Sequence, residues 1–384
     1  MFVHALALKN LLSFRNLTSV ALQELNIIIG PNGAGKSNLI DAISLLQTLP
    51  GNPNNFLATR GGPNDWIWRG RPIADGPARL TCVFEVEGRQ LLYEIAFNAV
   101  QNSIVIQSES LRPAKGVNRK FGYMDRSGSK ISIGDIDGTN APHMTATINA
   151  TESVLAVYRN PSDPTPLTQM ARAFGDVRVY RDFRTGPQDG ARSGIASASP
   201  KHPLDASGSN LALVLQEMDF HGSLNEVKKY LGRLSTSFED LKIRLEGGIA
   251  QLYVTEKGAG RVPATRLSDG TLRFLCLMAV LFDHAPAQLV CIEEPEIGLH
   301  PDALRLVADA LRNASQRMQL IVTTHSSALI DYFSDEPECI VACEKDFDGN
   351  TKFKRLRSDR LNEWLQDYTL GDLWRRGEVG GTVR

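Results

Sequence analysis

Apolar runs separated by polar and glycine-rich segments give the first outline of this 384-residue chain. Short β-branched runs predict strands, and apolar residues at helical spacing predict helices. The clearest strands cover Phe2–Leu8, Leu25–Ile29, Leu289–Ile292 and Gln319–Thr323, and the clearest helices cover Lys36–Gln47, Leu272–Phe282 and Pro301–Ser315. Strands and helices are mixed at both ends of the chain, so we predict an α/β fold.

Alternating apolar and polar residues predict antiparallel hairpins in other parts of the chain. The paired runs are Arg79–Val86 with Gln90–Asn98, Leu241–Leu245 with Ala250–Thr255, and Cys339–Glu344 with Lys352–Arg357. Between these hairpins, Arg184–Pro203 is dense in Gly, Ser, Ala and Pro. That composition predicts a mobile loop.

A glycine-rich segment directly follows the strand at Leu25–Ile29 and fits the pattern G-x-x-x-x-G-K-[ST]. Glycines let backbone N–H groups turn inward around phosphate oxygens, and the next helix points its positive end at the same anion. Lys36 would contact the β- and γ-phosphates of a nucleotide, and the Ser37 hydroxyl would coordinate Mg²⁺. The predicted nucleotide-binding residues are Gly30, Asn32, Gly33, Ala34, Gly35, Lys36, Ser37 and Asn38.

Two adjacent carboxylates, Glu293 and Glu294, close the apolar strand that begins at Leu289. In a P-loop protein, an acid at the carboxyl end of a neighbouring strand serves the Mg²⁺ shell, and the next acid can polarise the attacking water. Successive side chains on a strand point to opposite faces, so we assign Glu293 to the metal and Glu294 as the candidate general base. His325 follows another strand end, where an imidazole can contact the γ-phosphate.

A third polar segment, Leu267–Thr271, begins an apolar helix. Ser268 offers an N-cap, and Gly270 at the helix start leaves N–H groups for an anion. Taken alone, this segment is best explained as an ordinary helix cap. Its functional interpretation depends on the motifs that surround it in the sequence.

Composition limits the partners and the cellular compartment that we expect for the protein. The formal net charge of −1 gives no global basic field for nucleic acid, although a local basic patch would suffice for DNA. The five cysteines are scattered, which favours buried thiols over a cysteine zinc site. We find neither a signal peptide nor an apolar run long enough for a bilayer, so we expect a cytoplasmic protein without a membrane partner.

As a set, these segments resemble the motifs of ABC-type ATPases of the RecF/SMC/OLD-like branch. Walker A (Gly30–Ser37), the signature (Leu267–Thr271), Walker B (Leu289–Glu294), the D-loop (Glu296–Pro301) and a switch histidine occur in that family's order. The resemblance implies a P-loop ATPase head with a mixed β-sheet, an antiparallel β lobe and an α/β insertion between Walker A and the signature. The expected domains are residues 1–112, the insertion at 113–260, and residues 261–384.

The resemblance also implies a homodimer in the ATP-bound state, with two copies arranged head to tail. Walker A, Walker B and the histidine of one copy would face Ser268, Asp269 and Gly270 of the other. Arg15 corresponds to an arginine that contacts phosphate in relatives. Two positions depart from the family pattern, because Glu293 replaces the usual Asp and Asp269 replaces the first signature glycine. No Q-loop glutamine is assigned.

The function implied by the resemblance is Mg²⁺-dependent ATP hydrolysis in DNA repair or anti-phage defence, through DNA or a separate effector such as a nuclease. Only Ser358–Arg384 follows the last predicted hairpin. This is too little for a fused nuclease, so we expect the chain alone to hydrolyse ATP without cutting DNA. An ATP-gated scaffold with little turnover is one alternative. The ATPase subunit of an ABC transporter is another, against which the long gap between Walker A and the signature argues.

Overall fold

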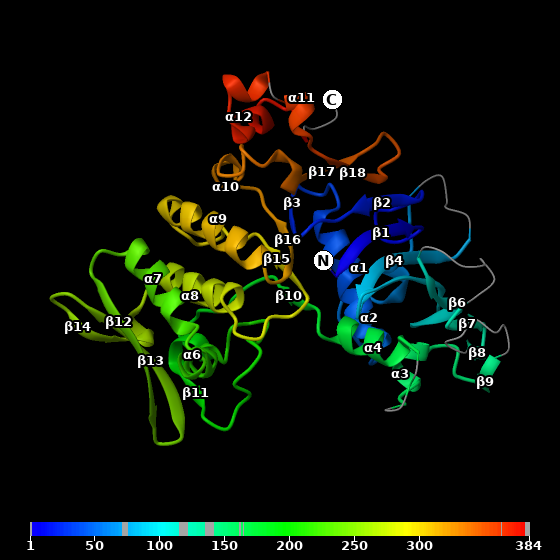
Figure 1. The fold of residues 1–384 in the computed structure, drawn as a ribbon, viewed down its shortest axis with the longest axis horizontal. Helices are drawn as coiled ribbons and strands as arrows, with labels where there is room; N and C mark the ends of the chain where they lie inside the picture. The colour runs from blue at the N-terminus through cyan, green and yellow to red at the C-terminus, as the bar shows by residue number, and fades with distance from the viewer. Residues whose placement is uncertain are drawn as a thin grey trace. The chain divides into compact units, whose positions relative to one another are not determined.

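The computed structural model describes residues 2–70, 76–114, 122–134, 142–160, 163, 165–361 and 363–380. The chain divides into two compact units, and Figure 1 labels most of their elements. Unit 1 consists of Met1–Val177, Glu338–Arg360 and Arg376–Arg384, and unit 2 consists of Arg178–Pro337 and Leu361–Arg375. The three-part domain division expected from the motifs remains a prediction.

An antiparallel sheet of eight strands forms a large part of unit 1, in the order β2-β1-β4-β5-β6-β7-β8-β9. Burial alternates strictly along β4, so one face of this strand packs on the core, as its period-2 pattern predicted. The strands are β1 (Val3–Lys9), β2 (Thr18–Ala21), β4 (Ala78–Val86), β5 (Arg89–Val100), β6 (Ser103–Pro113), β7 (Met124–Ser127), β8 (Lys130–Gly134) and β9 (Pro142–Thr147).

A second group of strands in unit 1 carries the glycine-rich segment. β3 (Leu25–Ile29) runs parallel to β17 (Ile340–Lys345), which forms an antiparallel hairpin with β18 (Thr351–Arg355). All five residues of β3 are buried, as expected for a continuous apolar strand covered on both faces. The helices of this unit are α1 (Lys36–Thr48), α2 (Pro53–Ala58), α3 (Val154–Val157), α4 (Leu167–Gly175) and α11 (Ser358–Leu361).

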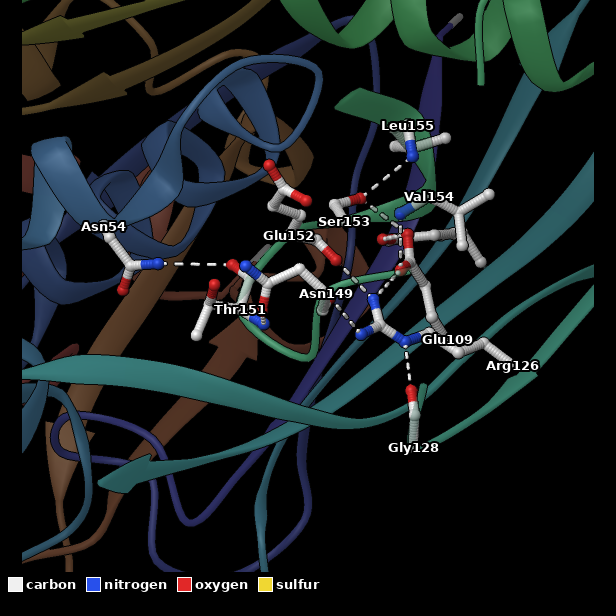
Figure 2. Close-up of polar contacts among 11 residues, drawn as sticks. Asn54, Glu109, Arg126, Gly128, Asn149, Thr151, Glu152, Ser153, Val154 and Leu155 are labelled. Atoms are coloured by element: carbon white, nitrogen blue, oxygen red, sulfur yellow. Dashed lines mark hydrogen bonds and ion pairs between the residues drawn. The ribbon is translucent and has the colours of Figure 1, made fainter. Parts of the chain in front are cut away.

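A buried ion pair attaches the segment after β9 to the eight-stranded sheet (Figure 2). The side chains of Glu109 on β6 and Arg126 on β7 are both 0% exposed, and their closest charged atoms are 3.4 Å apart. Glu109 accepts hydrogen bonds from the Tyr93 and Ser153 hydroxyls and the Val154 N–H, and Arg126 donates to the main-chain oxygens of Gly128, Asn149 and Glu152. These bonds compensate both charges, which a buried pair requires.

Unit 2 contains three parallel strands, with β15 (Leu289–Glu293) between β10 (Arg178–Tyr180) and β16 (Gln319–Thr323). A second, antiparallel sheet packs against a cluster of helices (Figure 1). The sheet strands are β11 (Ile195–Ala196), β12 (Phe238–Glu246), β13 (Ile249–Glu256) and β14 (Gly260–Pro263), and the helices of the unit are α5 (Gly190–Ser193), α6 (Leu211–Phe220), α7 (Leu224–Leu234), α8 (Asp269–Leu281), α9 (Pro301–Ser315), α10 (Ser327–Asp331) and α12 (Leu370–Arg375).

The segment Arg184–Pro203 has more regular structure than the predicted loop. It contains α5 and β11, and Ile195 of β11 pairs with Ala250 of β13. The prediction was wrong here because β13 offers backbone partners that local composition cannot reveal. Within the described ranges, no helix combines the length and apolar content needed to cross a membrane.

Candidate functional site

The glycine-rich segment occupies the turn from β3 into α1, and Lys36 is the first residue of this helix. Lys36 is buried, and its Nζ donates to the main-chain oxygens of Gly30 at 2.8 Å and Pro31 at 3.1 Å. The ammonium group therefore lies against the loop. Among the described residues, no side chain caps the N-terminus of α1, so its positive end is suited to a phosphate. Ser37 is exposed at the same end.

Ser13 and Thr351, which were not among the predicted site residues, hold the glycine-rich loop in place. The Thr351 hydroxyl lies 2.7 Å from both Ser13 Oγ and the Ala34 oxygen, and the Asn38 amide donates to Ser13 Oγ at 2.7 Å. Gly35 has φ +115°, and a Cβ at this position would lie 2.3 Å from Thr351 Oγ1. A glycine is therefore needed here for both conformation and space.

Arg15 lies in unit 1 with its guanidinium against the turn between β17 and β18. Its Nη1 is 3.1 Å from Asp348 Oδ2. The Arg15 guanidinium, to which the resemblance assigned a phosphate contact, is therefore paired with Asp348 in this structure. A phosphate contact by Arg15 remains a prediction.

Glu293 and Glu294, at the carboxyl end of β15, have different neighbours. Glu293 pairs with Arg181, which directly follows β10. Glu294 lies one residue beyond the strand at φ +48°, in the left-handed region that residues other than glycine seldom adopt and that often marks functional positions. Its Oε1 is 3.4 Å from His325 Nε2, and both side chains are about one-third exposed, at 34% and 32%. A carboxylate and an imidazole are thus available together to a ligand.

Glu296 supports the histidine and was not assigned from the sequence. Its Oε1 accepts hydrogen bonds from the Thr324 hydroxyl at 2.7 Å and from the His325 N–H at 2.8 Å. The carboxylate therefore fixes the main chain that carries His325. The available signal was a third acid two residues beyond Glu294, but its partner lies 29 positions along the chain.

The signature segment lies at the start of α8 in unit 2. Ser268 is the N-cap, and its Oγ accepts the Thr271 N–H at 3.1 Å. A Cβ on Gly270 would lie 2.8 Å from the Gly298 oxygen of the D-loop, so only glycine allows this close approach. A cavity of about 460 Å³ lies beside these residues, and its wall also includes Phe274, Leu299 and His300.

Asp269, which replaces the first signature glycine, is held by Arg192 of α5. The two charged groups are 2.6 Å apart, and Arg192 also donates to the Leu267 oxygen at 2.7 Å. Arg192 is 12% exposed, whereas Asp269 is 69% exposed. Arg192 carries no local signal in the sequence, because its partner lies 77 positions along the chain. The Asp269 side chain, which departs from the family pattern, is therefore fixed in position by Arg192.

The fold and these segments define the class of a P-loop ATPase with an ABC-type head. The family model described as "AAA domain, putative AbiEii toxin, Type IV TA system" matches residues 25–114 and 189–331. The chain belongs to this family and is an ATP-hydrolysing enzyme, and its fold is that of an ABC-type ATPase head.

Known proteins of similar sequence or structure agree with this assignment. An ATP/GTP phosphatase of Helicobacter pylori is 23% identical over 379 residues, which cover 93% of each chain. An SMC head bound to the C-winged helix domain of ScpA has a TM-score of 0.60 at 15% identity, covering 94% of this chain and 99% of that one. A Pyrococcus furiosus SMC head bound to the C-terminal domain of ScpA has a TM-score of 0.57 at 15% identity, covering 95% and 99%. At this identity the structural likeness concerns the fold.

Proposed function

We propose that Mg²⁺ and ATP join two copies of this chain head to tail and that hydrolysis separates them. The main support is the start of α8, where Ser268 and Asp269 are exposed and therefore accessible to a nucleotide bound by a second copy. Further support comes from the family description, which names a toxin system, and from SMC heads whose solved structures hold a partner protein. The ATPase cycle would act in anti-phage defence or DNA repair, through DNA or a separate effector such as a nuclease.

In this proposal, each predicted residue has one task. Lys36, already directed at the loop carbonyls, transfers its donors to the β- and γ-phosphates. Glu294 polarises the attacking water, and His325 contacts the γ-phosphate. Ser37 and Glu293 offer the oxygen ligands that Mg²⁺ prefers, and when bound the ion would neutralise phosphate charge. Ser268, Asp269 and Gly270 of the second copy supply the start of α8 to the same nucleotide.

The nucleotide assignment is tested with the Lys36→Ala variant. We expect ATP affinity to fall roughly 10- to 100-fold, because hydrogen bonds between a cation and phosphate are lost. Fluorescent-nucleotide titration and phosphate release measure binding and turnover. Lys229→Ala, which removes an exposed lysine of α7 paired with Glu226, is the matched control and should match the wild type. Wild-type ATP affinity in Lys36→Ala would show that the P-loop assignment is wrong.

A further inference from the structure

Imidazole and carboxylate groups gather at the carboxyl-terminal end of α8, in unit 2. His202 Nε2 lies 2.9 Å and 3.1 Å from the two carboxylate oxygens of Asp283, and His284 Nδ1 lies 3.4 Å from Asp283 Oδ1. The potential ligand atoms of these three residues are all within 4.8 Å of one another. In the part of the chain that the structure describes, no other set of His, Cys, Asp and Glu side chains converges in this way.

Among these three residues, His284 has a buried side-chain nitrogen, Nδ1, without a hydrogen-bond partner in the described ranges. Burial lowers the pKa of His284, and although Asp283 opposes this shift, the nearby His221 and His202 reinforce it. An imidazole nitrogen without a hydrogen-bond partner can offer its lone pair to a metal ion.

An imidazole, a carboxylate and an ammonium group surround these three residues. The His221 ring, at the end of α6, stacks on the His284 ring with centroids 4.1 Å apart. Glu217 lies 3.5 Å from His221, and Lys201 lies 4.0 Å from Glu217. The group of three residues thus combines two imidazoles with one carboxylate and is not a cluster of acids alone.

The end of α8 that carries Asp283 and His284 is held in place and is open to solvent. The carboxyl-terminal end of α8 carries the negative end of the helix dipole. Arg317 donates to the main-chain oxygens of Leu281 and Asp283 at 2.7 Å and 2.8 Å, so it holds the chain that presents Asp283 and His284. His202 and His284 are 31% and 18% exposed at their side chains, so an ion can enter from solvent.

We propose that His202, Asp283 and His284 bind a transition-metal ion of the zinc class, with water completing the coordination. Two imidazoles and one carboxylate suit zinc and its first-row neighbours, whereas Mg²⁺ and Ca²⁺ prefer oxygen ligands alone. Bonds of about 2.0–2.2 Å place the ligands roughly 3.5 Å apart. Small side-chain rotations from the observed distances therefore suffice. The ion fastens the segment that carries His202 to the end of α8.

The test is metal binding by the full-length chain after removal of bound ions with a chelator, in the absence of nucleotide. Titration calorimetry with ZnCl₂ should show one site per chain in the wild type. His284→Asn removes one ligand, so affinity should fall at least ~10-fold. His4→Asn is the matched control, because His4 also contacts a carboxylate, Glu85 at 3.2 Å, but lies in unit 1. Its zinc affinity should equal that of the wild type.

A spectroscopic readout and a second variant complete the test. Co²⁺ should give visible absorption bands of a nitrogen and oxygen site without thiolate bands, because all five cysteines are buried. ZnCl₂ should raise the unfolding temperature of the wild type and not of His284→Asn. If that variant does not fold, the more exposed His202→Asn replaces it. Absence of stoichiometric zinc binding by the wild type, or equal affinity in the wild type and the ligand variant, would overturn the proposal.

Discussion

Glu294 lies one residue beyond the end of β15, and its carboxylate lies beside the His325 imidazole. The adjacent Glu293 pairs with Arg181 instead. The left-handed backbone at Glu294 and the hydrogen bond from its N–H to the Thr323 oxygen fix this position. The two acids thus have separate environments although they are adjacent in the sequence. This separation leads to a test of the general base.

We expect Glu294→Gln to reduce ATP turnover roughly 10²- to 10⁴-fold, because the amide cannot accept the proton of the attacking water. Nucleotide affinity should change little, since glutamine keeps the size of the side chain. Phosphate release at saturating ATP measures the loss, with Glu226→Gln on the exposed side of α7 as the control. Equal and low turnover in the wild type and Glu294→Gln, with ATP-dependent association in both, would favour a scaffold with little hydrolysis.

At this scale, contiguous residues could be predicted from the sequence, whereas residues brought together from distant positions could not. The place of Gly30–Ser37 between β3 and α1 could be predicted because the whole motif lies within one turn and its flanks. Ser13 and Thr351, which hold that turn, are 338 positions apart and carry no local pattern. Arg192 was hidden for the same reason, since its partner Asp269 lies 77 positions away. Long-range partners of a motif follow only from the fold.

Among the elements, β6 and β7 show how a buried charge can organise its surroundings. Their Glu109–Arg126 pair fixes the segment from Asn149 to Val154 through main-chain hydrogen bonds (Figure 2). Asn54 on α2 connects to the same region, because its amide donates to the Thr151 oxygen and its carbonyl accepts the Ile104 N–H. The cluster therefore links the sheet, the segment before α3 and the element that follows α1.

Removal of the arginine should destabilise unit 1 strongly. We expect Arg126→Met to lower the free energy of unfolding by about 3–5 kcal/mol, because Glu109 is left charged and buried without its partner. Urea denaturation followed by circular dichroism gives this value. Arg112→Met is the matched control: Arg112 pairs with Asp125 at 2.6 Å, but both side chains are about half exposed. The control should change stability by about 0.5 kcal/mol or less. Equal effects of the two substitutions would contradict a structural role for the buried pair.

Element boundaries were predictable where periodicity was strong. The helices α8 and α9 and the hairpin of β12 and β13 were confirmed, because the spacing of their apolar residues matches the period of each element. The Arg184–Pro203 segment was not, since β11 exists only through pairing with β13. A two-residue strand has no periodicity of its own from which it could be predicted.

For the molecule as a whole, the order of the motifs was sufficient to predict an ABC-type ATPase fold. The limits of the compact units could not be derived in this way. Unit 1 is assembled from three separate stretches of chain, because β17 and β18 return to β3 after unit 2 has been traversed. Such closure depends on contacts between distant segments, which local composition does not record.

Association of two copies is tested at the signature. We expect Ser268→Arg to retain ATP binding and to lose ATP-dependent dimerisation, because a large cation would replace the small N-cap of α8. Gel filtration with and without a slowly hydrolysed ATP analogue distinguishes monomer from dimer. Ser127→Arg, at an exposed serine of β7, is the control and should dimerise like the wild type. Dimerisation of Ser268→Arg equal to that of the wild type would exclude this contact.

The distance along the chain between the two residues that hold the P-loop has a consequence for biosynthesis. Thr351 is made 338 residues after Ser13. At synthesis rates of about 5–20 residues per second, this separation corresponds to roughly 20–70 s on the ribosome. During that interval the apolar β3 lacks its parallel partner β17, and the glycine-rich loop lacks the hydrogen bond from Thr351. We therefore expect nucleotide binding to be among the last properties that the nascent chain acquires.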